Sequence, residues 1–203
     1  MIFYHSTYQK KKILKDDKIK EQQFNYIKYI EYILDVLTKQ DVEDMKIPYS
    51  YPGAKIQAPF MGIGIYCFDN LVSAASYKSQ AKIVNILYHN DFTLFDLDDP
   101  IVKAHIYIIL EDEAERVINE MSDVNSKEVW LLILDVIRKA FYEDFVNCQP
   151  VVGIFLHFWY LILKKQSHDI IKKGFYDMID VERKRNQEYY FLIKNKQKII
   201  SLS

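Results

Sequence analysis

Glycine, proline and cysteine are all scarce in this chain of 203 residues. Five glycines and five prolines are too few for a linker-rich or collagen-like polypeptide, and they favour a folded, helix-rich composition. The two cysteines, Cys67 and Cys148, stand far apart and in no metal-ligand spacing, so they indicate neither a disulfide framework nor a zinc site. We therefore expect a reducing, cytoplasmic environment and no metal.

The chain also lacks an excess of charge and a long apolar run. Its 27 lysines and arginines nearly balance 28 aspartates and glutamates, so a nucleic-acid or lipid partner must be recognised by a local patch. The lysine-rich residues 9–15, QKKKILK, are one candidate for such a patch. The most apolar run, residues 151–163, falls short of the roughly 20 residues that span a bilayer. We expect a buried helix there, no membrane partner, and no secretory signal at residues 1–12.

Half of the residues are apolar, and the length suits one domain with a sizeable core, so we expect a single domain over residues 1–203. Runs rich in β-branched and aromatic residues predict strands at 2–5, 63–68, 92–97 and within 188–202. A segment with three prolines and a Tyr-Pro-Gly turn, residues 47–59, predicts a surface loop between the first elements.

Helical periodicity predicts three helical regions: Asp16 to Leu37 with aspartate caps at its start, a helix capped by Asp69 or Asn70 that runs to about Tyr88, and almost all of residues 101–180. Strands therefore lie near both ends of the chain, and helices fill its middle. This order predicts an α+β fold in which the first and last segments share one sheet.

Two of the five glycines, Gly62 and Gly64, lie one residue apart at the start of a predicted strand. A strand glycine marks a bulge, tight packing against a neighbour, or a place where a ligand approaches the backbone. The glycine pair alone does not distinguish a bulge, tight packing and a ligand site. The segments that accompany the pair are needed to choose among them.

Three segments together resemble the NAD-binding segments of the ADP-ribosyltransferases, in the branch shared by poly(ADP-ribose) polymerases and diphtheria toxin. They are FYHST at 3–7, GIGIYCFDNLVSAASY at 62–77 and NQEYYFLIKNKQKI at 186–199. In that branch a histidine ends the first strand, a Gly-x-Gly-Ile-Tyr strand leads into a helix with a second tyrosine, and a glutamate opens a late strand. Tyr77 follows Tyr66 by the same offset as in the polymerases. The resemblance implies a split β-sheet core with a large helical insertion at about 101–180.

The resemblance implies NAD as the cofactor and a role for each matching residue. Glu188 is the expected catalytic carboxylate, which stabilises an oxocarbenium-like transition state and holds a ribose hydroxyl. His5 is expected to hydrogen-bond the adenosine ribose, and Tyr66 and Tyr77 to sandwich the nicotinamide ring. His5 and Tyr66 are thus expected in the catalytic set with Glu188.

The remaining expected NAD contacts come from Gly62, Gly64, Ser6 and Ser73. The two glycines would let a flat ring approach the backbone. Ser6 stands where the family usually has a glycine that meets the nicotinamide amide, and Ala74 stands where it often has a serine, with Ser73 adjacent. The amide contacts are therefore where this chain departs from the family.

The resemblance implies an enzyme that transfers ADP-ribose from NAD to a macromolecular acceptor, protein or nucleic acid. Asn186 precedes Glu188 by two, so the Gln-x-Glu or Glu-x-Glu pair of arginine-modifying toxins is absent. Small members of this kind resemble bacterial toxins of toxin-antitoxin or anti-phage modules, which implies an antitoxin protein as a partner. The alternatives are an NAD glycohydrolase, a catalytically silent binding or immunity protein, and a helical interaction module that matches by chance.

Overall fold

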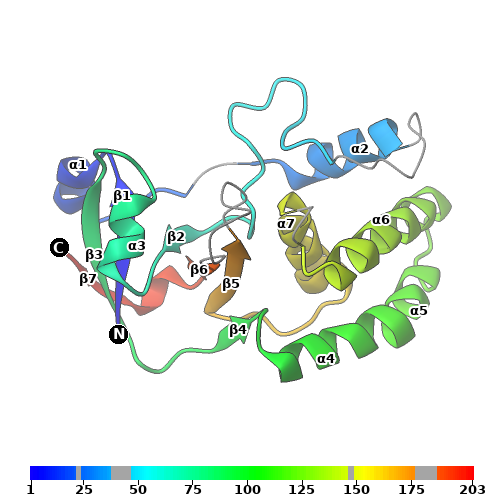
Figure 1. Ribbon diagram of the computed structural model, residues 1–203. Helices are drawn as coiled ribbons and strands as arrows, with labels where there is room; N and C mark the ends of the chain where they lie inside the picture. The colour runs from blue at the N-terminus through cyan, green and yellow to red at the C-terminus, as the bar shows by residue number, and fades with distance from the viewer. Residues whose placement is uncertain (22–23, 38–46, 146–148, 177–186) are drawn as a thin grey trace, which may run out of the picture. The chain divides into compact units, whose positions relative to one another are not determined.

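The computed structural model describes residues 1–21, 24–37, 47–145, 149–176 and 187–203 and has a mixed α+β architecture, as predicted (Figure 1). Two compact units make up the chain. The first unit contains both sheets and consists of Met1–Gln22, Gly64–Val102 and His168–Ser203. The second unit is helical and consists of Gln23–Ile63 and Lys103–Ser167.

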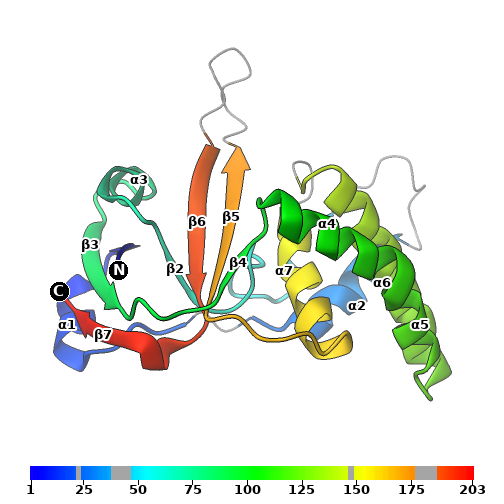
Figure 2. The same ribbon diagram turned by 90° about the horizontal axis from the view of Figure 1, so that it is seen from below.

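The smaller sheet of the first unit has the strand order β1-β3-β7, with β1 at Ile2–Thr7, β3 at Lys82–Tyr88 and β7 at Ile199–Leu202. All its pairings are antiparallel, and β1 and β7 both pair with β3. The prediction that the first and last segments share a sheet is confirmed. Two short helices, α1 (Lys10–Asp16) and α3 (Leu71–Ser76), lie against opposite faces of this sheet (Figures 1 and 2).

The larger sheet has the order β2-β6-β5-β4. Its strands are β2 (Ile65–Cys67), β6 (Gln187–Ile193), β5 (Ile170–Tyr176) and β4 (Leu94–Asp96). β5 and β6 form a long antiparallel pair that is visible side by side in Figure 2, whereas β4 runs parallel to β5. A short 3₁₀ turn, η4 (Lys196–Lys198), leads from β6 into β7.

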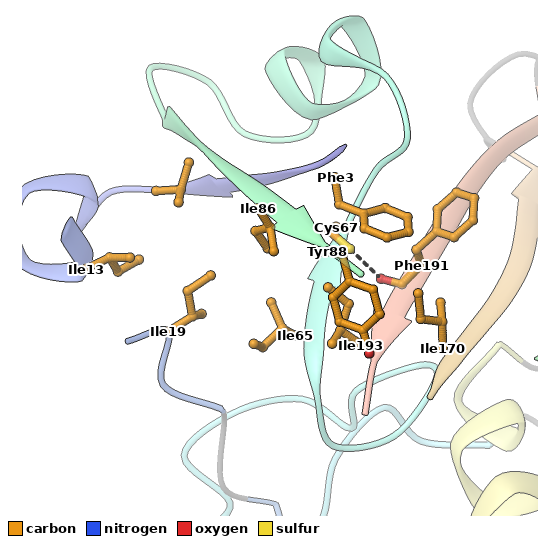
Figure 3. Packing of buried hydrophobic residues seen from close by; sticks show 11 residues of the cluster. Phe3, Ile13, Ile19, Ile65, Cys67, Ile86, Tyr88, Ile170, Phe191 and Ile193 are labelled. Atoms are coloured by element: carbon orange, nitrogen blue, oxygen red, sulfur yellow. Dashed lines mark hydrogen bonds between the residues drawn. The ribbon is translucent and has the colours of Figure 1, made fainter. Parts of the chain in front are cut away.

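An apolar core holds the two sheets of the first unit together. Phe3 of β1, Ile13 of α1, Cys67 of β2 and Phe191 of β6 are among its buried members, and the Cys67 thiol donates to the Phe191 carbonyl oxygen at 3.4 Å (Figure 3). The sheets are also joined by a bridge in which Tyr4 and Phe68 exchange two backbone hydrogen bonds of 2.8 and 3.0 Å. Burial of these side chains is the main stabilising term, at roughly 25 cal/mol per Å² of apolar surface.

The helices of the middle of the chain are α2 (Tyr26–Leu37), α4 (Pro100–Ile108), η2 (Ile109–Glu113), α5 (Ala114–Asn119), α6 (Val124–Tyr142), α7 (Pro150–His157) and η3 (Phe158–Ile162). η2 and η3 are π-helical turns, which leave local carbonyls available to other donors. Arg138 of α6 donates to the Leu110 carbonyl from Nε at 3.1 Å and from Nη2 at 2.6 Å. The apolar run at 151–163 forms α7 and η3 and is mostly buried, as predicted.

Three secondary-structure predictions are wrong. The helix expected from Asp16 is two helices, and Asp17 is the left-handed C-cap of α1 rather than an N-terminal cap. The helix expected to reach Tyr88 ends at Ser76, because residues 82–88 alternate in burial and pair with two strands. Part of the region expected to be helical, residues 170–176, forms β5 instead, since it fills the gap between β4 and β6.

The expected loop at 47–59 carries no helix or strand, as predicted. Across the described ranges, no helix combines the length and apolar character that a membrane crossing requires. The same residues contain no group of three or more histidine, cysteine, aspartate or glutamate side chains arranged to hold a metal ion. Cys148 and Asn186 lie outside the described residues.

Candidate active site

His5 lies on β1, on the face that also carries the buried Phe3, and its ring is tied to the second sheet. Its Nδ1 is 2.7 Å from the Tyr66 carbonyl oxygen. A carbonyl only accepts, so Nδ1 carries the proton and Nε2 of the neutral ring is left as an acceptor. Burial lowers the pKa of His5 and the nearby positive charge of Lys78 lowers it further, against the opposing effect of the Tyr66 hydrogen bond. The ring is therefore neutral at pH 7 and suited to accept from a hydroxyl.

Tyr66 is the middle residue of β2, between the buried Ile65 and Cys67, so its side chain points to the opposite face of the larger sheet. Its cross-strand partner is Leu192 of β6. Because side chains alternate along a strand, Tyr190 and Glu188 share that face with Leu192. Tyr66 and Glu188 thus belong to the same face of one sheet, although 122 positions separate them in sequence.

Glu188 stands near the start of β6, opposite Phe175 of β5, and is partly buried. The Tyr190 hydroxyl lies 3.4 Å from Glu188 Oε2, within reach of a long hydrogen bond. Tyr190 itself packs between the rings of Phe68 and Phe175, with centroid distances of 5.1 and 5.6 Å. The carboxylate therefore sits beside a hydroxyl whose ring is fixed by packing.

Tyr77 directly follows α3, whose start is fixed because the Asn70 side chain accepts from the Ser73 amide at 2.8 Å. The Tyr77 ring packs on Phe68 at 5.3 Å and edge-on to Tyr190 at 5.7 Å. It stays 42% exposed, so part of its surface is open to a ligand. Burial of the rest raises the pKa of its phenol.

Ser6 and Ala74 mark the departure from the family at the amide position. Ser6 is on the β1 face opposite Phe3 and is only 4% exposed, and its Oγ has no hydrogen-bond partner in the described part of the chain. Ala74 is fully buried on α3, which packs on β1. Ser73 is partly buried, and its amide is occupied by the Asn70 cap.

Glycine is required at positions 64 and 62 for different local reasons. A Cβ at Gly64 would lie 2.8 Å from both the Ile193 carbonyl oxygen and Leu192 Cδ1, so strand β6 approaches the backbone too closely for a side chain. Gly62, in the second unit, has a φ of +90° with open space around its Cα, so its backbone conformation favours glycine. Contact of either glycine with nicotinamide stays a prediction.

A chain of contacts connects the predicted site residues of the first unit. His5 bonds Tyr66, and the Tyr4–Phe68 bridge next to them carries the ring that touches both Tyr77 and Tyr190. Tyr190 in turn reaches Glu188. Segments near residues 5, 66, 77 and 188 therefore meet in one compact unit.

Sequence reasoning misses three neighbours of this set. Tyr190 carries a signal, because it lies two positions after Glu188 and so faces the same side of a strand. Lys78, whose ammonium lies 5.3 Å from the Tyr77 ring centroid, is marked only by adjacency. Lys173 pairs with Asp98 at 2.5 Å on the same sheet face as Tyr190, and 75 positions separate the two, so no local pattern could pair them.

No protein-family model, curated protein or solved structure matches this chain. The functional argument therefore depends on these residues and their geometry.

Proposed function

We propose that the chain is an NAD-dependent ADP-ribosyltransferase that modifies a macromolecular acceptor. The observation that supports this most is the convergence of His5, Tyr66, Tyr77 and Glu188, which come from three separate segments, in one unit. Two sheets joined at the Tyr4–Phe68 bridge are also compatible with the split-sheet core that the resemblance implies.

The residues present fit NAD. Bound NAD would supply a glycosidic bond whose cleavage releases neutral nicotinamide and builds positive charge on the ribose. Glu188 would stabilise that charge and hold a ribose hydroxyl, and Tyr190 would orient its carboxylate. Tyr77 would offer an aromatic face to the pyridinium ring. His5 would accept from a ribose hydroxyl through Nε2.

Release of nicotinamide from NAD by the purified protein tests the proposal. We expect Glu188→Gln to abolish release, because the amide carries no charge to stabilise the ribose cation. A matched control is Glu128→Gln, which removes an exposed carboxylate from α6. Equal release by both variants, or no release from the folded wild-type protein, would remove the catalytic assignment.

A second pair of variants tests the role of Tyr190. Tyr190→Phe removes the hydroxyl beside Glu188, whereas Tyr189→Phe removes one from the opposite face of the same strand. We expect kcat to fall about tenfold or more for Tyr190→Phe only, as for loss of one positioning group. A similar effect of both changes would indicate a general disturbance of β6.

Addition of a cell lysate separates transfer from hydrolysis. A Glu188-dependent release that rises with lysate, with label from the adenosine half of NAD on macromolecules, supports a transferase. Release that is equal with and without lysate, and leaves no label, would make the protein an NAD glycohydrolase. A toxin role predicts that induced wild-type protein, and not Glu188→Gln, arrests growth.

A further inference from the structure

We infer that the acceptor is single-stranded nucleic acid, bound on a surface of the first unit formed by Tyr8, Lys10, Lys11, Lys12, Lys78 and Lys82, which we term the Tyr8–lysine surface. That this surface binds single strands is argued from the surface itself. That the bound strand receives ADP-ribose rests on the proposed function.

The six residues come from segments that adjoin at one end of the smaller sheet. β1 ends and β3 begins there, with Thr7 opposite Lys82 in the strand register (Figure 1). The Tyr8 hydroxyl donates to the Ser79 carbonyl at 3.1 Å, which ties the end of β1 to the loop that carries Lys78. α1 begins at Lys10, immediately after this junction, and buries Ile13 while its lysines stay at the surface.

The charge of this surface is not neutralised within the described part of the chain. Lys10, Lys11, Lys12 and Lys82 form no ion pair there. The acidic residue of α1, Asp16, lies at the far end of the helix. A local positive patch thus stands on a chain whose formal net charge is −1, and it suits a phosphate backbone.

Two aromatic rings accompany the lysines. Tyr8 is 67% exposed while its hydroxyl is held at Ser79, so the ring is presented to solvent in a fixed position. Tyr77 is partly exposed beneath the Lys78 ammonium. Exposed rings between cations are the combination that single strands use, because unpaired bases stack on the rings while phosphates meet the cations. The bases of a duplex are stacked on one another and are not available to these rings. The carboxylates of an acidic polypeptide would pair with the lysines but would not stack on the Tyr8 ring.

The Tyr8–lysine surface adjoins the candidate active site through Lys78, because the Lys78 ammonium lies 5.3 Å from the Tyr77 ring centroid and its charge acts on His5. In the transfer, the bond between the ribose C1′ and nicotinamide breaks and nicotinamide leaves neutral. A bond forms between C1′ and a nitrogen or hydroxyl oxygen of the strand, and the proton of that group is released. No other reactant is needed.

Fluorescence anisotropy with labelled single-stranded DNA and RNA of mixed sequence, and with the same DNA as a duplex, tests binding in the absence of NAD. We expect single strands to bind more tightly than the duplex, with an affinity that falls as salt rises. Lys10→Gln/Lys11→Gln/Lys12→Gln should reduce the slope of log K against log salt by about two, from roughly 0.7 per phosphate contact. Tyr8→Ala should weaken binding by about fivefold or more, as for loss of one stacked base.

The charge-matched control is Lys28→Gln/Lys55→Gln/Lys139→Gln, which removes three exposed lysines from the second unit and should leave binding unchanged. No binding at about 100 μM protein, the weak limit for non-specific nucleic-acid binding, would overturn the inference. So would equal losses in both triple variants. Competition by polyglutamate as strong as by DNA, with no effect of Tyr8→Ala, would overturn it in favour of an acidic protein partner.

The two proposals fail separately. If single strands bind but no nicotinamide is released, the nucleic-acid-binding surface is supported and the ADP-ribosyltransferase assignment is rejected. If the enzyme is active and the Tyr8–lysine variants label acceptors as well as the wild type does, the acceptor inference falls.

Discussion

Replacement of Asp98 by asparagine should destabilise the first unit much more than other charge changes on the same sheet. Lys173 is 1% exposed and its Nζ lies 2.5 Å from Asp98 Oδ1, while Asp98 Oδ2 accepts from the Gly174 amide at 2.5 Å. Asparagine has nearly the same shape and still accepts a hydrogen bond, but it removes the negative charge that lies 2.5 Å from the buried ammonium. Such a loss costs about 3–5 kcal/mol, a large part of a typical unfolding free energy of about 5–15 kcal/mol.

The converse change should cost less. Lys173→Met removes the buried charge and leaves Asp98, 13% exposed, with the Gly174 amide and some access to water. We expect a loss of about 1–3 kcal/mol. The double variant Lys173→Met/Asp98→Asn should return to within about 2 kcal/mol of the wild type, because a buried ion pair exchanged for neutral groups is often close to neutral in free energy. The double variant is thus expected to be more stable than Asp98→Asn alone.

The neighbouring ion pair, between Asp96 of β4 and Lys172 of β5, provides a control. Lys172 and Asp96 lie 2.7 Å apart and both are partly exposed, so Asp96→Asn should cost no more than about 1 kcal/mol. Both tryptophans, Trp130 and Trp159, lie in the second unit, so tryptophan fluorescence does not report on this site.

Urea unfolding followed by circular dichroism, together with amide hydrogen exchange in β5 and β6, measures the effect where it arises. A cost of Asp98→Asn no larger than that of Asp96→Asn would refute the reasoning, because it would show that water or other groups satisfy the Lys173 ammonium. Strict additivity of the two single changes would refute it as well.

Three further changes have defined outcomes. Burial alone would raise the pKa of Asp169, but hydrogen bonds from a threonine, an asparagine and a lysine hold it well below its usual range. Its stabilising effect should be present above about pH 4 and lost as the pH falls, so Asp169→Asn should cost about 1–3 kcal/mol at pH 7 and flatten the acid limb of urea unfolding. Gly153→Ala would place a Cβ 2.5 Å from Tyr26 Oη and should destabilise the second unit by about 1–3 kcal/mol, measured by tryptophan fluorescence. Asn70→Ala should cost about 0.5–2 kcal/mol and speed exchange of the Ser73 amide.

The parts of the fold that could be predicted have local signals. Asn70 is a good N-cap, and the structure uses it to start α3. The β-branched and aromatic runs at both ends of the chain form β1, β6 and β7. In each case the residues that determine the helix or strand lie within it or next to it, so the element can be predicted without knowledge of the segments it packs against.

The parts that could not be predicted depend on partners distant in sequence. Residues 82–88 and 170–176 each become a strand between two others, and pairing overrides their local preference. Asp17 favours a helix start in the sequence, yet it takes a left-handed conformation at the end of α1, where its backbone N–H donates to the Ile13 carbonyl oxygen. In the candidate site, the motif identifies His5 and Glu188, but the groups around them come from other strands.

The residues proposed for NAD chemistry also hold the first unit together, and this decides which variants are informative. The His5 bond to the Tyr66 carbonyl and the Tyr4–Phe68 bridge are direct links between the two sheets. His5→Ala would remove such a link together with the proposed ribose contact, so a loss of activity would not tell the two apart. His5→Asn offers an amide that can donate to the Tyr66 carbonyl in place of Nδ1 but is too short to reach the position of Nε2. A variant that keeps its unfolding free energy while its KM for NAD rises would therefore assign His5 to binding, whereas equal losses of stability and activity would assign it to the sheet junction.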